Sequence, residues 1–161
     1  MRGLYRSFGY TGEMPSGVVG RVEVTVTGRR VVRRKSKIKG AGFGVYAAQP
    51  FNKNMRIVDY QGELISASKS DWRERRYQAK GMIWSFTVSR RLVRDGNVGG
   101  NIARFINHSC KPNCYSEIVK HTVWIRAARN IKTGEELTYD YNTGGEAGIQ
   151  CMCRPGCKNK I

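Results

Sequence analysis

The sequence lacks any long apolar run. No stretch comes close to the roughly 20 apolar residues that a membrane-spanning helix needs. The basic N-terminus also lacks the apolar core of a secretory signal peptide. We therefore expect neither a membrane location nor a secretory route. Internal repeats and low-complexity tracts are absent as well, so 161 residues with 40% hydrophobic content predict one globular domain.

Acidic residues are scarce. The chain has 12 Asp and Glu against 29 Lys and Arg, which gives a formal net charge of +17. Much of the excess lies early, at Arg2, Arg6, Arg21, Arg29, Arg30, Arg33, Arg34, Lys35, Lys37 and Lys39. Such a surface attracts polyanions, so DNA, RNA and nucleosomes are candidate partners. The alternative is a solvated basic face that only aids solubility, because charge indicates a class of partner and not what is done to it.

Cysteines are few, odd in number and unevenly placed. Five thiols without a secretion signal argue against a disulfide framework. Three of them crowd the motif Cys151-Met-Cys153-Arg-Pro-Gly-Cys157, whose Pro-Gly turn lets the sulfurs converge, and this predicts tetrahedral zinc in a reducing compartment. The fourth ligand must come from elsewhere, and the candidates are Cys110, Cys114, His108 and His121. The alternative is a set of free, oxidation-prone surface thiols.

Helix-forming segments are also rare. Before position 100 only residues 71–80 read clearly as helix, with Ser68 or Ser70 as the N-cap, and residues 101–105 suit one helical turn. Residues 1–20 read as a loose arm. Short strands are expected at 21–34, 38–48, 56–60, 63–65, 83–88, 91–93 and 137–141, with a hairpin at 118–127. Many short strands with little helix predict a mainly β fold.

A polar block follows directly on apolar residues in the middle of the chain. Its members are Asn107, His108, Ser109 and Asn113. Polar residues packed against a core need hydrogen-bond partners. The block is therefore either a site for a polar ligand or a buried turn that its own backbone satisfies, and the spacing alone leaves both open.

Two shorter features accompany this block. Gly42-Phe43-Gly44 would let backbone amides approach a ligand closely, but it lacks the third glycine and the βαβ context of a dinucleotide site. Tyr139 and Tyr141 fall on the same face of the last expected strand. Aromatic residues at strand ends otherwise belong to the core.

Taken together and in this order, these segments resemble the SET-domain family of protein lysine methyltransferases. The resemblance covers about residues 30–161. It is carried by Lys39-Gly-Ala-Gly-Phe-Gly-Val-Tyr-Ala47, Tyr60-Gln-Gly-Glu-Leu-Ile65, Arg104-Phe-Ile-Asn-His-Ser-Cys-Lys-Pro-Asn113, Gly134-Glu-Glu-Leu-Thr-Tyr-Asp-Tyr141 and the cysteine tail. It implies a β-clip fold of several small sheets with a C-terminal pseudoknot. The implied parts are a basic arm with the first strands (1–30), a SET domain (31–143) and a zinc-binding post-SET segment (144–161).

The resemblance also implies a role for each matching residue. S-adenosylmethionine would be held by Gly42, Phe43, Gly44, Arg104, Asn107 and His108. Tyr141 would be the catalytic tyrosine, and Tyr139 would govern how many methyl groups are added. Zinc would be held by Cys110, Cys151, Cys153 and Cys157. The family's Tyr-x-Phe motif appears here as Trp84-Ser85-Phe86, where the indole offers one N–H donor and no acceptor for the lysine amine.

The implied function is methyl transfer to a lysine of a histone or another basic-tailed protein in the nucleus, or in a host nucleus for a bacterial or viral source. The hydroxyl of Tyr139 would fill the space of a second methyl group, which favours a mono- or dimethyl product. One alternative is a catalytically weak or dead SET fold that binds nucleosomes through its basic N-terminal region, which the charge and Trp84 favour. Another is a plain zinc-containing nucleic-acid-binding module, which leaves the tyrosine pair unexplained.

Overall fold

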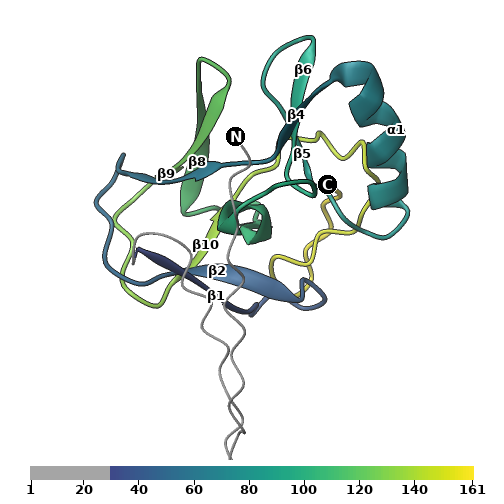
Figure 1. The fold of residues 1–161 in the computed structure, drawn as a ribbon. Helices are drawn as coiled ribbons and strands as arrows, with labels where there is room; N and C mark the ends of the chain where they lie inside the picture. The colour runs from purple at the N-terminus through teal and green to yellow at the C-terminus, as the bar shows by residue number, and fades with distance from the viewer. Residues whose placement is uncertain (1–29) are drawn as a thin grey trace, which may run out of the picture.

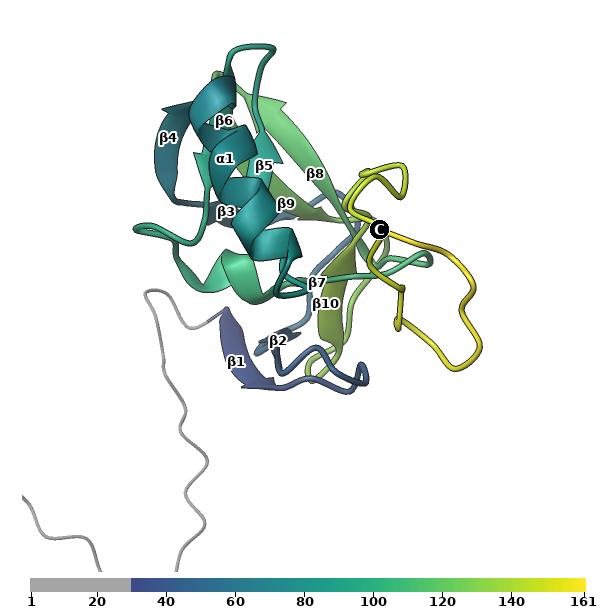
Figure 2. The ribbon, with the colours of Figure 1, turned by 90° about the vertical axis from the view of Figure 1, so that its right-hand side faces the viewer.

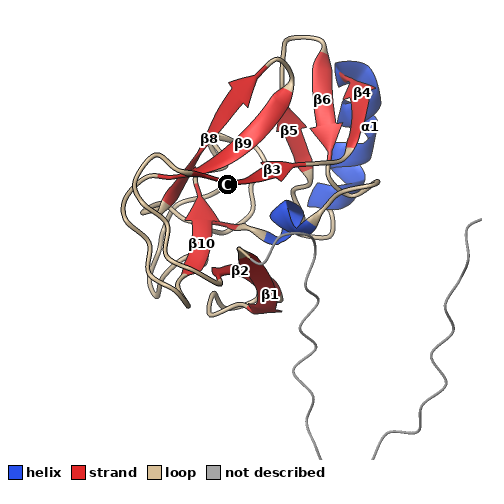
Figure 3. Cartoon of the chain, turned by 60° about the vertical axis from the view of Figure 1, so that its left-hand side comes forward, coloured by secondary structure: helices blue, strands red, loops and turns tan. Residues whose placement is uncertain are grey.

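The computed structural model describes residues 30–161, so the expected arm and strands before residue 30 lie outside the described residues. Short strands dominate the chain (Figure 3). Their order is β1 (Val31–Lys35), β2 (Phe43–Ala47), β3 (Arg56–Tyr60), β4 (Glu63–Ser66), helix α1 (Ala67–Gln78), β5 (Ser85–Thr87), β6 (Leu92–Asp95), a 3-10 turn (Ile102–Phe105), β7 (Asn107–His108), β8 (Cys114–Val119), β9 (Thr122–Ala127) and β10 (Glu136–Tyr139). The mainly β architecture predicted from the sequence is confirmed. None of the helices in the described part is long and apolar enough to cross a membrane.

The strands form three small sheets. Their strand orders are β1-β2-β10-β7, β3-β9-β8 and β4-β6-β5. Strand β9 shows most clearly why these segments are strands, because its side chains alternate between partly exposed and buried positions, with Val123, Ile125 and Ala127 facing the core. All pairs within the three sheets are antiparallel except β10 with β7, which is parallel. Chain segments distant in sequence therefore meet at β7 and β10, as the implied pseudoknot requires.

One core lies between the sheets. Its fully buried side chains include Val45, Phe51, Ile106, Ile125 and Leu137, which come from all parts of the described chain. Burying a side chain of this size stabilises a fold by about 1.5–3 kcal/mol. This packing holds the 3-10 turn against β2 and β3, while β10 lies between β2 and β7 in its sheet.

Several expected boundaries were wrong, and three of them have a clear local cause. Helix α1 begins at Ala67 rather than residue 71, because the extended Ser66 caps it by accepting a hydrogen bond from the Lys69 amide, while Ser70 is buried in the helix. The hairpin begins at Cys114 rather than residue 118, since all six residues of β8 pair with β9. The last strand ends at Tyr139 rather than residue 141, because the Asp140 carboxylate accepts from the Asn142 amide and turns the chain.

Helix α1 is fixed to the β4-β6-β5 sheet by a buried carboxylate (Figure 2). Asp95 is 0% exposed and accepts hydrogen bonds from Arg73 Nη1 at 2.7 Å and from the Tyr77 hydroxyl at 2.9 Å. Arg73 also contacts Glu63, at 2.7 Å. Breaking a buried ion pair on one side leaves an uncompensated charge, so these contacts define where the helix lies.

Candidate active site

Two hollows lie on either side of the segment after β10. The first, which we name the tail cavity, has a volume of about 430 Å³ and is lined by residues 38–43, 80–84, the 3-10 turn and β7, and tail residues 149–153. The second, the helix groove, has a volume of about 780 Å³ and lies among α1, β5, β8 and residues 142–147. Ile83 and Tyr141 are the two described residues that line both.

Glu136 organises one wall of the tail cavity. Its carboxylate accepts hydrogen bonds from the Ser36 hydroxyl (2.6 Å), the Lys37 amide (3.0 Å), the Tyr46 hydroxyl (2.9 Å) and Asn107 Nδ2 (3.1 Å). Burial, with this carboxylate as a second cause, raises the pKa of Tyr46 to about 12. The carboxylate thus ties the loop after β1 to Asn107.

The glycine pair Gly42 and Gly44 divides between two roles. Gly42 lines the tail cavity and has a φ of +70°, which a residue with a Cβ rarely adopts. Gly44 does not line the cavity; a Cβ there would collide with the Glu136 carboxylate. The expected close approach to a ligand is therefore available at Gly42 and Phe43, whereas Gly44 makes room for the carboxylate that supports the wall.

Asn107 and His108 line the tail cavity. Asn107 Nδ2 also donates to the Phe43 carbonyl at 2.9 Å. Burial lowers the pKa of His108, an effect that the Asp140 carboxylate opposes, so the ring is neutral at pH 7. In this neutral form its Nδ1 accepts from the Tyr141 amide at 3.3 Å, which fixes the chain just before the tail.

The rest of the polar block is structural. Asn113 donates from Nδ2 to the Glu136 carbonyl and accepts at Oδ1 from the Thr138 amide, both at 2.8 Å. The Ser109 amide donates to the Tyr139 carbonyl at 3.1 Å. Both interpretations of the block thus apply, each to half of it: Asn107 and His108 line a cavity, while Ser109 and Asn113 hold β10 in place.

Arg104 and Trp84 form an aromatic and cationic part of the tail cavity wall. The Arg104 guanidinium lies 4.7 Å from the ring centroid of Phe105 and 5.3 Å from that of Trp84. The indole Nε1 of Trp84 is buried and has no hydrogen-bond partner among residues 30–161. Trp84 does not line the helix groove, so its indole contacts the tail cavity only.

Tyr139 and Tyr141 come together, with ring centroids 4.8 Å apart. The Tyr141 hydroxyl donates to the Ile106 carbonyl at 2.9 Å, while Tyr139 is 6% exposed and stacks on Phe86. Burial raises the pKa of both tyrosines above 10. Both hydroxyls therefore stay protonated at neutral pH and can position a polar group, but neither can act as a base.

Four thiols converge beside these residues. The sulfurs of Cys110, Cys151, Cys153 and Cys157 all lie within 4.8 Å of one another. Cys110 Sγ is 3.7 Å from Cys151 Sγ and 3.8 Å from Cys157 Sγ. Tetrahedral zinc with Zn–S bonds of about 2.3 Å needs sulfurs about 3.8 Å apart, so the donor set fits this ion. Among the fourth-ligand candidates the fold brings Cys110 to the tail, whereas Cys114 is buried in the core.

Comparison with known proteins agrees with this geometry. A family model described as the SET domain matches residues 42–142. The chain belongs to the SET-domain family. This SET domain is 40% identical over 144 residues to a Yarrowia lipolytica protein named histone-lysine N-methyltransferase, H3 lysine-4 specific, with 80% of this chain covered. It is 44% identical over 119 residues, 70% of this chain, to the histone-lysine N-methyltransferase trithorax of Drosophila virilis. It spans only 12% and 3% of those two proteins.

Solved structures share the SET-domain fold. The polycomb repressive complex 2 of Chaetomium thermophilum matches with a TM-score of 0.65 and 29% identity over 81% of this chain and 16% of the other. A structure described as ctPRC2 in an autoinhibited conformation bound to S-adenosylmethionine matches with a TM-score of 0.65 and 32% identity, covering 71% of this SET domain and 15% of that chain.

Two residues of the site were missed by sequence reasoning. Ile83 lines both hollows, but an isoleucine in a short strand carries no functional signal. Glu136 lies inside a recognised motif of the SET domain, where its neighbours drew attention instead. Its role depends on Ser36, Tyr46 and Asn107, which no local pattern connects to it.

Proposed function

We propose that this chain is the catalytic domain of a protein lysine N-methyltransferase that transfers a methyl group from S-adenosylmethionine to a lysine of a histone in the nucleus. The observation that carries the proposal is the position of Tyr141, which lies on the wall shared by the tail cavity and the helix groove. The Yarrowia and Drosophila relatives are named as histone-lysine N-methyltransferases, and the Chaetomium structure is described as bound to S-adenosylmethionine.

The tail cavity is the proposed donor site. S-adenosylmethionine supplies an electrophilic methyl group when bound. Gly42 and Phe43 offer backbone groups to this cavity, and Asn107, neutral His108 and the Arg104 guanidinium offer polar side chains. Phe105, which Arg104 covers, adds an apolar surface of the kind that ligand cavities use.

The helix groove is the proposed acceptor site. The described residues that line it include three carboxylates, Asp71, Glu74 and Glu146, and a single cation, Arg90. None of the three carboxylates forms an ion pair within residues 30–161. A basic tail can therefore enter this groove although the whole chain carries +17. The expected DNA contact through the N-terminal region stays a proposal, because most of that region lies outside the described residues.

Lysine must lose its proton before it can attack a methyl group. A lysine that passes between Tyr139, Tyr141 and Phe86 leaves water, and desolvation lowers the pKa of its ammonium group. The protonated tyrosines cannot accept that proton, so it leaves to solvent before transfer. The Tyr141 hydroxyl then aligns the neutral amine with the donor methyl group, and such alignment can contribute several kcal/mol to catalysis.

This mechanism predicts a rising pH profile. Below the pKa of the substrate amine, kcat/KM should increase about tenfold per pH unit, because only the neutral amine reacts. Burial raises the pKa of Tyr141 above 10, so its hydroxyl keeps its proton throughout the range and causes no decline. We expect this increase from about pH 7 to 9 with saturating donor. A rate independent of pH, or one that falls in this window while the protein stays folded, would contradict the mechanism.

We propose that zinc joins the four thiols and fixes the tail against the donor site. Cys151 and Cys153 belong to the thiol cluster and also line the tail cavity, and Cys110 follows His108 by two residues. A closed set of four thiolates is typical of structural zinc, which supplies folding energy and no chemistry.

We propose a mono- or dimethyl-lysine product. Tyr139 lines the helix groove, is almost fully buried and stacks on Phe86 at a centroid distance of 6.0 Å. Tyr139→Phe should remove the hydroxyl of this side chain, leave room for another methyl group and shift the product toward higher methylation. Mass spectrometry of a histone H3 peptide after exhaustive reaction gives the distribution. An unchanged distribution at equal turnover would remove Tyr139 from this role.

The same assay tests the function itself. Labelled methyl groups from S-adenosylmethionine are offered to core histones and to nucleosomes, and mass spectrometry locates the label. Label on a histone lysine supports the enzyme. Absence of transfer to either substrate, with donor binding intact, would favour the non-catalytic chromatin binder and implicate Trp84.

A further inference from the structure

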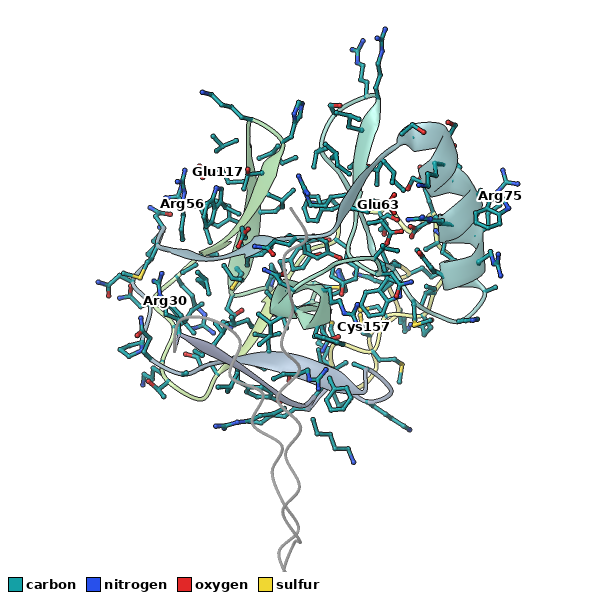
Figure 4. The ribbon with its side chains drawn as sticks, in the orientation of Figure 1. Arg30, Arg56, Glu63, Arg75, Glu117 and Cys157 are labelled. Carbon is teal, nitrogen blue, oxygen red and sulfur yellow. The ribbon has the colours of Figure 1, made fainter. Side chains whose placement is uncertain are left out.

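The helix groove contrasts in charge with the rest of the molecule. Three of its lining residues are acidic and one is basic, in a chain with 29 basic and 12 acidic residues. The cations of α1 do not offset this. Arg73 is bound to Glu63 and Asp95, Arg76 lies over Trp72, and Arg75 projects from the outer side of the helix (Figure 4).

Glu74 is the groove carboxylate whose hydrogen bonding is incomplete. Its Oε2 atom is shielded from solvent and has no hydrogen-bond partner among residues 30–161. Burial raises the pKa of Glu74, with the charge of Asp95 adding to the rise and the nearby Ser85 opposing it. A buried acceptor without a partner destabilises the protein, and more so when it is charged. A ligand that brings a donor removes this destabilisation.

Two hydroxyls extend the acceptor set. Ser70 on α1 and Ser85 on β5 both line the groove, with their oxygens 3.4 Å apart. Hydroxyl oxygens can accept hydrogen bonds in addition to donating them. The carboxylate and these oxygens therefore suit a group that carries several N–H donors and a positive charge.

We propose that Glu74, together with Ser70 and Ser85, forms a subsite of the helix groove that binds a positively charged side chain of the substrate other than the methylated lysine. The inference rests on the proposed function and adds a second requirement to it, namely a cation at a fixed distance along the peptide from the target. An arginine or a lysine supplies this chemistry, and the test distinguishes them.

The test compares wild type, Glu74→Gln and Glu117→Gln. The control glutamate lies on β8 and is ion-paired with Arg56 and Arg126 on the far side of the molecule from α1 (Figure 4), and its neutralisation changes the net charge equally. The probe is a fluorescent peptide of the histone H3 amino-terminal tail, followed by anisotropy. In further peptides each arginine and each non-target lysine is replaced singly by glutamine. The melting temperatures show that every variant is folded.

We expect one replacement to weaken binding to wild type and to Glu117→Gln about tenfold, as a charge-assisted hydrogen bond predicts. The same replacement should change binding to Glu74→Gln by less than about twofold. Equal losses in all three proteins, or no peptide binding to wild type, would overturn the subsite. Methyl transfer is recorded on the same peptides. No transfer together with the expected binding pattern would reject the proposed function and leave the subsite standing.

Discussion

The substitution Tyr141→Phe should lower the rate of methyl transfer by about 10²–10³-fold, the range measured when one preorganised hydrogen-bonding group is removed from an active site. The hydroxyl donates its proton to the Ile106 carbonyl, so its oxygen would accept from the substrate amine. The ring stays in place beside Tyr139, so packing and donor binding should change little. The substitution removes the hydroxyl, which donates a hydrogen bond to the Ile106 carbonyl at 2.9 Å. This hydroxyl belongs to the wall between the two hollows. Single-turnover transfer of a labelled methyl group to a histone H3 peptide measures the effect directly.

Tyr115→Phe is the matched control for this experiment. Tyr115 lies on β8 and is exposed, and its hydroxyl donates to Asn54 Oδ1 at 3.3 Å. We expect wild-type turnover from this variant. A Tyr141→Phe protein as active as wild type would remove the hydroxyl from the proposed mechanism, and a large loss accompanied by weaker donor binding would assign it to binding instead.

Replacement of one thiol should have an effect of similar size by a different route. Cys157→Ser should reduce bound zinc from one ion per chain to none and weaken S-adenosylmethionine binding by about 100-fold or more, because metal binding and ordering of the tail are coupled. Cys157 is suited to this test because it does not line the tail cavity (Figure 4 shows its place). Any loss of donor affinity must therefore act through the arrangement of residues 149–153. Zinc content by mass spectrometry and donor affinity by calorimetry are measured together.

Cys114→Ala serves as the control thiol. Cys114 is buried in the core next to Asn113, and burial raises its pKa to about 12. Removing it should cost about 1 kcal/mol of stability, the contribution of one small buried group. Zinc content and donor affinity should stay at wild-type values. Full donor affinity in zinc-free Cys157→Ser would separate the tail from the donor site and contradict the proposal.

The parts of the site that the sequence could predict are local. The tail motif places three thiols within seven residues, and the two tyrosines are two residues apart, so neighbouring positions in the chain become neighbours in space. Spacing alone left four candidates for the fourth ligand, and only the pairing of β10 with β7 carries Cys110 to the tail. The assigned roles of the site residues stay predictions until they are tested.

The parts that could not be predicted depend on contacts between distant segments. Gly44 resembles a cofactor glycine in sequence, yet the space at its Cα is filled by a carboxylate 92 positions later in the chain, that of Glu136. The acidic helix groove joins α1, β5, β8 and residues 142–147, and no motif connects these segments. Sequence composition even suggests the opposite sign of charge. The helix start was missed because Ser66 is the last residue of β4, so its capping role depends on the turn from this strand into α1.

Among the described residues, Ile83 and Tyr141 line both hollows, and the C-terminal segment that contributes to each hollow lies on the same side of the molecule as α1 (Figure 1). This arrangement has a consequence for the order of events in the proposed reaction cycle. Under the proposed function each substrate has its own compartment, so spent cofactor can be exchanged for fresh while the peptide stays in place. The number of methyl groups added in one encounter then depends on the rate of cofactor exchange relative to the rate at which the peptide dissociates. In such an enzyme, contacts along the peptide lengthen residence and thereby influence the product without touching the reacting atoms.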